Sequence, residues 1–304
     1  ATSFSQATIS CTGAALANLT YTSATNTYCT GTAISTNVAA LGTSSGTPQY
    51  TVSPSLPTGL AISSSTGNIT GTPTTAQTST AYTVTADNGC TSTTATVNIE
   101  IVTSPTAPTS GAVSLSTYSG FTANWTTNGA SSYQLDVAKD ASFTNLVTGY
   151  NALNVGNTST YAVTGLNAGA TYYYRVRSVN GSCVSANSTS QTATTTAITS
   201  VASGNWNATT TWNSGTVPVC GDVVNIANTH NVTVNSSSNV SGAITIASGG
   251  TLTIASGDLT VGCTLNNTPL TNNGTLTVTG GTLNVNGNIV IASGATFNQS
   301  GGEI

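Results

Sequence analysis

Few side chains in this sequence could do chemistry. Seven acids, three basic residues and a single histidine are spread over 304 residues. His230 stands in the segment Asn-Thr-His-Asn-Val-Thr-Val, and its nearest acid in the sequence is Asp222. Acid–base hydrolysis needs two carboxylates at a defined separation, and nucleophilic catalysis needs a base beside Ser or Cys. Because no serine stands in a nucleophile-elbow context, the sequence predicts no catalytic residue and no enzyme activity.

Oxygen ligands for calcium are the other chemistry to consider. Asp87, Asp136 and Asp140 supply carboxylates at expected loops and strand ends, but no Asp-x-Asp-x-Asp run exists. Single carboxylates in such places usually cap turns. The cysteines form no Cys-x-x-Cys pair or Cys/His cluster, which are the spacings of zinc sites. We therefore expect no metal and no cofactor.

The chain carries almost no charge. Charged residues make up 3% of it and its formal net charge is -4, against about a quarter charged residues in ordinary soluble domains. Three cations cannot bind a nucleic-acid backbone or an anionic membrane surface, and no apolar run approaches the ~20 residues of a membrane span. The sequence excludes nucleic acid as a partner and membrane insertion, and it lets another copy of the chain approach with little repulsion.

Two of the three cations stand close together in the sequence. Arg175 and Arg177 are two residues apart in an expected strand and therefore share one face of it. They could hold a carboxylate of a ligand, or they could pair with Asp136 on a neighbouring strand. The internal pair is the expectation.

Six cysteines predict disulfides and an oxidising, extracellular setting. Cys29 and Cys90 both fall in the first third of the chain, and Cys220 and Cys263 both fall in the last third. Short modules of this kind are usually held by internal bridges, so the expected pairs are Cys29 with Cys90 and Cys220 with Cys263. Cys11 and Cys183 receive no assigned partner.

The elements that must position these residues are β-strands throughout. From 242 to 304, units such as Thr-Leu-Thr-Ile alternate apolar and polar residues between Gly- and Asn-rich turns. A slower repeat of about 24 positions relates three pairs of residues: Leu252 to Leu276, Leu259 to Leu283 and Leu265 to Ile289. This period predicts a right-handed parallel β-helix with stacked apolar ladders. A run of antiparallel hairpins is the alternative, since Asn273-Gly274 is a good hairpin turn.

The first segment, residues 1–103, shows short strands and turn residues at the spacing of a β-sandwich. The stretch 50–74, Tyr-Thr-Val-Ser-Pro-Ser-Leu-Pro-Thr-Gly-Leu-Ala-Ile and onward to Gly-Thr-Pro-Thr, resembles the immunoglobulin-like repeat of bacterial surface proteins. Cys29 and Cys90 are similar in placement to the cysteines of versions carried by adhesins of gliding bacteria. The resemblance implies an immunoglobulin-like sandwich with a structural role.

The second segment, residues 104–197, follows a stiff Pro-containing connector. Its motifs Phe-Thr-Ala-Asn-Trp at 121–125 and Tyr-Tyr-Tyr-Arg-Val-Arg at 172–177, with Leu166 at the corner turn, resemble a fibronectin type III domain over the whole segment. Trp125 is expected in the core because of its size and its place in the alternation. A sugar-stacking platform is the alternative role for Trp125.

The third segment, residues 198–304, opens with a pattern that resembles the solenoid-capping module of large bacterial adhesins. The resemblance rests on the spacing of Trp206, Trp212, Pro218, Gly221 and Asp222. The first coil of a solenoid exposes its apolar ladder, so the two Trp side chains are expected to cover Ile226 and Val232.

The resulting organisation is all-β: two immunoglobulin-like sandwiches in tandem followed by a parallel β-helix. The resemblances imply a structural or adhesive segment of a secreted cell-surface filament or adhesin of gliding, Bacteroidetes-type bacteria, exported by type IX secretion. An accessory glycan-binding or spacer region of a secreted polysaccharide-degrading enzyme is the alternative. Expected partners are other copies or neighbouring modules of a longer chain, through strand edges at Ala1–Ile9 and Ile289–Gly302, and surface glycans.

Overall fold

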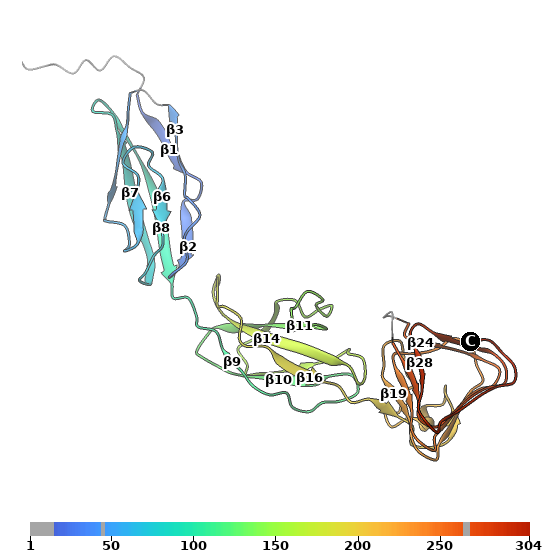
Figure 1. Cartoon of the computed structure of the whole chain (residues 1–304). Helices are drawn as coiled ribbons and strands as arrows, with labels where there is room; N and C mark the ends of the chain where they lie inside the picture. The colour runs from blue at the N-terminus through green and yellow to red at the C-terminus, as the bar shows by residue number, and fades with distance from the viewer. Residues whose placement is uncertain (1–14, 44–45, 264–267) are drawn as a thin grey trace, which may run out of the picture. The chain divides into compact units, whose positions relative to one another are not determined.

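The computed structural model describes residues 15–43, 46–263 and 268–304 (Figure 1). The described residues form β-strands and one short 3-10 helix. They divide into two compact units. One takes in the residues up to Ala107 with Asn128–Gln134 and Arg177–Asn187, and the other takes in Pro108–Thr127, Leu135–Val176 and Ser188–Ile304. The second sandwich contributes residues to both units. The domain boundaries expected from the sequence, after residues 103 and 197, therefore stay predictions.

The first sandwich is built around one four-stranded sheet in the order β2-β8-β7-β4, with the pairs β1-β3 and β5-β6 beside it. Its strands are β1 (Ala17–Tyr21), β2 (Thr25–Cys29), β3 (Ala39–Thr43), β4 (Gln49–Ser53), β5 (Leu60–Ile62), β6 (Ile69–Gly71), β7 (Gln77–Asp87) and β8 (Ser92–Val102). Strand β2 runs parallel to β8, and β7 runs antiparallel to it. Alternate residues of β8 point inward, and Val97 and Ile99 are fully buried.

Steric constraints explain why two positions of the motif at residues 50–74 are glycine. Gly59 and Gly71 both have positive φ, at 94° and 128°, a region that side chains rarely adopt. A Cβ on Gly59 would overlap the carbonyl of Thr72, and one on Gly71 would overlap the carbonyl of Gly59. The β5-β6 pair therefore closes only with glycine at both positions.

The second sandwich has a three-stranded sheet, β13-β10-β9, and a second sheet in the order β12-β11-β14-β15 with β16 also on β14. Its strands are β9 (Thr109–Ser110), β10 (Phe121–Thr126), β11 (Ser132–Ala138), β12 (Leu153–Gly156), β13 (Thr160–Val163), β14 (Thr171–Asn180), β15 (Cys183–Val184) and β16 (Gln191–Thr194). Trp125 is only 4% exposed. It is a core residue as expected, and the sugar-platform alternative is wrong because its ring has no open face.

The third segment is a parallel solenoid with three sheets, in the orders β17-β19-β22-β25-β28, β18-β20-β23-β26-β29 and β21-β24-β27. Its elements are β17 (Ile198–Thr199), β18 (Gly204–Asn205), the 3-10 helix η1 (Thr209–Thr211), β19 (Val224–Ile226), β20 (Asn231–Val234), β21 (Asn239–Ser241), β22 (Ile244–Ile246), β23 (Thr251–Ile254), β24 (Asp258–Val261), β25 (Leu270–Asn272), β26 (Thr275–Val278), β27 (Thr282–Val285), β28 (Ile289–Ile291) and β29 (Thr296–Gln299). All pairings within these sheets are parallel. The hairpin alternative is therefore wrong.

Two of the three expected ladder pairs are confirmed. Leu252 pairs with Leu276 and Leu259 pairs with Leu283, and all four side chains are fully buried. Stacking inside the coil removes each leucine from water, which contributes about 1.5–3 kcal/mol per side chain. The ladders therefore form the core of the solenoid.

The third expected pair, Leu265 with Ile289, is wrong. Leu265 lies outside the described residues, and Ile289 pairs with Leu270. The coils differ in length: Ile244 pairs with Leu270, 26 positions on, and Leu270 pairs with Ile289, 19 positions on. The register between strands follows the alternation of buried residues, whereas the turns between strands tolerate insertions. A constant repeat therefore holds only where the turns of successive coils have equal length.

Candidate functional site

His230 contacts a serine that is distant in the sequence. Its Nδ1 lies 3.0 Å from Ser200 Oγ and 3.1 Å from the Ser200 carbonyl oxygen. Ser200 is 2% exposed, and its Oγ accepts the N–H of Ala227 at 2.8 Å. In the described structure both hydrogen bonds of the His230 ring run to Ser200, so the ring holds two successive coils together. Sequence reasoning missed this contact because only the stacking of coils brings residues 200 and 230 side by side.

Asp222, the acid nearest to His230 in the sequence, serves another purpose. Its Oδ1 accepts the N–H of Ala168 at 2.8 Å, and its Oδ2 accepts the N–H of Val219 at 2.8 Å. The N–H of Val223 donates to the Ala168 carbonyl at 2.8 Å. The two bonds to Ala168 join the loop between β13 and β14 of the second sandwich to the start of the solenoid, within one compact unit. Asp222 is therefore a structural clamp.

The two tryptophans cover the first coil as expected. Trp206 and Trp212 are 0% and 2% exposed, and they share one apolar cluster with Ile226 and Val232. Their rings meet edge to face with centroids 5.0 Å apart, and Trp212 Nε1 donates to the Trp206 carbonyl at 2.8 Å. Ala168 from the second sandwich belongs to the same cluster. The first coil is thus closed by its own tryptophans and by a sandwich loop.

The expected pair of Asp136 and an arginine is present. Arg175 Nε lies 2.9 Å from Asp136 Oδ2, and Asp136 is 2% exposed. Its other oxygen accepts the N–H of Ala152 at 2.7 Å. The Arg175 guanidinium also lies over the ring of Phe143, 4.1 Å from its centroid. This arginine is therefore occupied inside the protein.

The remaining loop carboxylates cap turns. Asp140 accepts the N–H groups of Thr144 and Asn145 at 2.9 and 3.1 Å, and the Thr144 hydroxyl also donates to it. These hydrogen bonds, that of the Thr144 hydroxyl first, lower the pKa of Asp140. Asp87 Oδ1 accepts the N–H of Gly89 at 2.7 Å. Across the described ranges, no three His, Cys, Asp or Glu residues form a group that could hold a metal ion.

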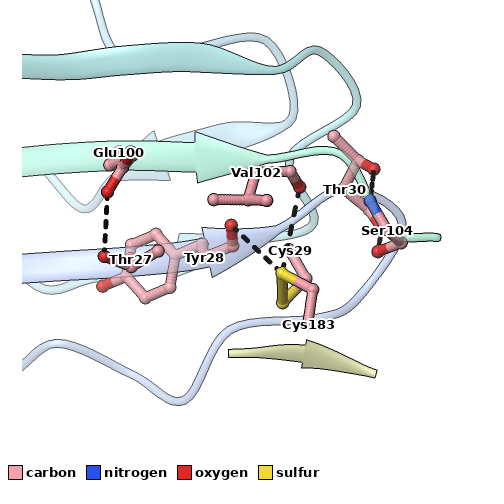
Figure 2. Close-up of a disulfide and its surroundings, with 8 residues drawn as sticks. All are labelled: Thr27, Tyr28, Cys29, Thr30, Glu100, Val102, Ser104 and Cys183. Carbon is pink, nitrogen blue, oxygen red and sulfur yellow. Dashed lines mark hydrogen bonds between the residues drawn. A yellow bond between two sulfur atoms is a disulfide. The ribbon is translucent and has the colours of Figure 1, made fainter. Parts of the chain in front are cut away.

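The disulfide of Cys29 differs from the expectation. Cys29 bonds to Cys183, 154 residues away, with a Cα–Cα distance of 5.6 Å, as Figure 2 shows. The expected pair of Cys29 with Cys90 is wrong. Cys90 is itself in a disulfide.

The parallel pairing of β2 with β8 explains the error. It places Cys29 beside Val102, at the end of β8 from which the chain leaves the sandwich. Cys90 precedes the other end of β8, an 11-residue strand, and these two ends are roughly 33 Å apart at ~3.3 Å per residue. A disulfide needs Cα atoms within about 7 Å. Cys183 Sγ instead lies 4.0 Å from the carbonyl oxygens of Tyr28 and Val102.

The expected bridge in the third segment is present. Cys220 bonds to Cys263 across 43 residues, with a Cα–Cα distance of 5.7 Å. Cys220 precedes β19 and Cys263 follows β24, so the bond spans neighbouring coils. It fixes the same part of the solenoid that Asp222 clamps to the sandwich.

Three apolar side chains of the last described coil are exposed. Phe297 stacks on Leu276 but is 39% exposed, whereas Leu276 is fully buried. Val290 and Ile291 of β28 are each 47% exposed. We call Val290, Ile291 and Phe297 the terminal apolar patch. The other strand edge considered from the sequence, Ala1–Ile9, lies outside the described residues.

The first sandwich matches a known family. Residues 16–103 match the family described as Putative Ig domain. No curated protein sequence matches the chain. No helix among the residues described is long and apolar enough to cross a membrane.

Several solved structures are similar to this chain. Consecutive domains of titin are 15% identical with a TM-score of 0.37, over 56% of this chain and 61% of that one. The FN1–FN3 domains of chicken CNTN1 are 16% identical with a TM-score of 0.40, over 60% of this chain and 66% of that one. The FN5 domain of Drosophila Lar is 16% identical with a TM-score of 0.26, over 30% of this chain and 97% of that one. The chain thus spans under two thirds of the first two structures.

Proposed function

We propose that this chain is a structural and adhesive segment of a secreted filament or adhesin on the surface of gliding bacteria, exported by type IX secretion. The observation that carries the proposal is the Cys29–Cys183 disulfide. It joins the strand that ends beside the exit of the first sandwich to a hairpin of the second. Tension applied along the chain therefore passes through a covalent bond as well as through the Pro-containing connector. Such a link gives a protein stiffness and reach.

The junction between the second sandwich and the solenoid supports the same function. Asp222, the backbone of Ala168 and the two tryptophans join the sandwich loop to the first coil, and the Cys220–Cys263 bond staples the coils beside it. Disulfides persist in oxidising, extracellular settings. An almost uncharged surface rich in hydroxyl and amide groups also favours contact with other surfaces, since few ions must be desolvated.

Single-molecule stretching of the full chain tests this function. In the oxidised protein the disulfide keeps 154 residues from extending, so Cys183→Ser should lengthen the released contour by at most roughly 500 Å at about 3.4 Å per residue. The disulfide of Cys90 stays intact in this variant and restrains part of that length. Cys220→Ser is the matched control, because it removes a loop of 43 residues and should add roughly 150 Å. An unchanged contour length in Cys183→Ser would refute the mechanical role.

The cellular part of the proposal needs a separate measurement. Antibodies against the chain should label intact cells of the organism that produces it, and deletion of the segment should weaken attachment to surfaces under flow. Labelling that requires permeabilised cells would contradict a cell-surface location. Unchanged attachment after deletion would contradict the adhesive role.

A second function, an accessory region of a secreted polysaccharide-degrading enzyme, is favoured by a cavity beside Lys139 that could hold a sugar. In that case the sandwiches are spacers and the cavity holds the substrate near a catalytic domain. A catalytic domain in the same gene would support this function over the filament.

A further inference from the structure

A cavity of about 420 Å³ opens where the second sandwich meets the solenoid, inside one compact unit. Its volume is within the range of about 300–1,000 Å³ that is usual for small-molecule sites. Lys139, Asn145, Thr171 and Tyr172 line it from the sandwich, and Val223, Ala243 and Thr268 line it from the solenoid. We call it the junction cavity. The hydrogen bonds of Asp222 and Asn167 hold its two sides together.

Three polar side chains of the junction cavity are available to a ligand. Among the residues that the structure describes, the Lys139 ammonium, the Asn145 amide and the Thr171 hydroxyl form no hydrogen bond. Their neighbours are already occupied: Asn167 Nδ2 donates to the Cys220 carbonyl at 2.9 Å, and the Tyr172 hydroxyl accepts the N–H of Asn167 at 3.0 Å. Free polar groups that converge on one cavity are the usual mark of a binding site.

The charge of the junction cavity favours an anion. Lys139 is one of three cations in the chain, and Arg175 is already paired with Asp136. None of the described residues that line the cavity is an acid. The two nearest in the sequence, Asp140 and Asp222, both accept backbone N–H groups. An exposed ammonium in this setting attracts a carboxylate, and the resulting hydrogen bond is assisted by charge.

The remaining wall suits the face of a sugar ring. Val223, Ala170 and Ala243 give it small apolar surfaces. Gly242 packs against the backbone of Gly221, where a Cβ would lie 2.8 Å from the nearest atom. A ring can lay its C–H groups on these small apolar side chains while its hydroxyls reach Asn145 and Thr171.

We propose that the junction cavity binds a carboxylate-bearing saccharide unit, such as a hexuronic acid residue of an acidic polysaccharide. Lys139 holds the carboxylate, Asn145 and Thr171 hydrogen-bond ring hydroxyls, and Val223 with the alanines contacts the ring face. This proposal rests on the proposed function, because an adhesive segment and an accessory region of a polysaccharide-degrading enzyme both need a site that binds a saccharide. The stretching experiment does not involve the cavity, so the two proposals fail separately.

Calorimetric titration of the oxidised full chain with oligogalacturonate tests the site, with neutral galactose oligomers of equal length as the comparison. Binding should be confined to the acidic oligomer and should weaken as salt is added. Lys139→Gln should lower the affinity roughly 10- to 100-fold, as expected for the loss of a charged hydrogen bond, and Lys139→Arg should retain most of it. Thr171→Val should cause a smaller loss.

Thr277→Val, at a solenoid residue that does not line the cavity, is the matched control and should bind like the natural chain. Circular dichroism of each variant establishes that it is folded. Equal affinity for neutral oligomers, no binding of the acidic oligomer at millimolar concentration, or full affinity in a folded Lys139→Gln protein would each overturn the proposal.

Discussion

The carboxylate of Asp222 accepts the backbone N–H of Ala168 at 2.8 Å, across 54 residues of sequence. Asp222 is 6% exposed, and its second oxygen accepts the N–H of Val219. A buried carboxylate is costly unless it is hydrogen-bonded. Here backbone donors on both oxygens offset that cost, and the same acid links the second sandwich to the solenoid.

Removal of this acid should therefore destabilise the unit that contains both parts. Asp222→Ala leaves two backbone N–H groups without an acceptor, which should lower the free energy of unfolding by about 2–4 kcal/mol. Asp222→Asn keeps one acceptor oxygen and should lose less. Denaturant unfolding provides the measurement, with Asp258→Ala on the solenoid as the control. A difference under about 0.5 kcal/mol between Asp222→Ala and that control would contradict the clamp.

The stability lost on truncating a side chain of the apolar ladder should depend on how deeply that side chain is buried. Leu276 is fully buried between Leu252 and Phe297, whereas Phe297 is 39% exposed. Leu276→Ala should cost about 2–5 kcal/mol because it opens a cavity, and Phe297→Ala should cost clearly less. Leu276→Asp should unfold the solenoid and leave the amides of β7 and β8 protected in hydrogen exchange. Equal costs for the two alanine variants would contradict the stacked core.

Stability should fall at high pH because of a half-buried tyrosine, Tyr21, in the first sandwich. Burial, and to a smaller extent the charge of Tyr50, raises the pKa of Tyr21 to about 12. The neutral Tyr21 hydroxyl donates to the Gly67 carbonyl at 2.7 Å. An unfolded tyrosine ionises near pH 10, so the unfolded chain releases its proton first. The stabilisation is complete below about pH 10 and is lost as the pH rises through about 12.

Unfolding of the first sandwich measured between pH 8 and 12 checks this dependence. Tyr21→Phe should be less stable at pH 8, because it loses the hydrogen bond, but its stability should fall less steeply above pH 10. Burial also raises the pKa of Tyr28 in the same sandwich, so a residual fall is expected in the variant. Identical slopes in the two proteins would contradict the role of Tyr21.

Self-association is expected through the terminal apolar patch. Ile291 and Phe297 are exposed on β28 and β29, which are the last strands of their sheets among the described residues. An edge strand of this kind can recruit a partner unless charge or another segment covers it. A double change, Ile291→Asp with Phe297→Asp, should shift the chain from filaments or oligomers toward monomers in sedimentation velocity. Leu115→Asp, at a side chain that is 79% exposed elsewhere, should not. Unchanged association in the double variant would exclude this patch.

The sequence determined the local elements, because alternation of buried and exposed residues is a property of each strand. Leu252 and Leu276 could be assigned to one ladder, and Trp125 to a core, from periodicity and side-chain size. Gly59 and Gly71 could likewise be read as turn positions. The pairing of Ile289 could not be predicted, because it depends on the length of a turn that no repeat constrains.

The tertiary structure alone decided which distant residues meet. The parallel pairing of β2 with β8 carries Cys29 to one end of the sandwich and leaves Cys90 near the other, so a pair that looked local is impossible. The stacking of coils brings Ser200 to His230, and the docking of a sandwich loop brings Ala168 to Asp222. Composition and spacing describe neighbours along the chain, whereas these contacts follow from strand order and packing, which place residues 30 to 154 positions apart within bonding distance.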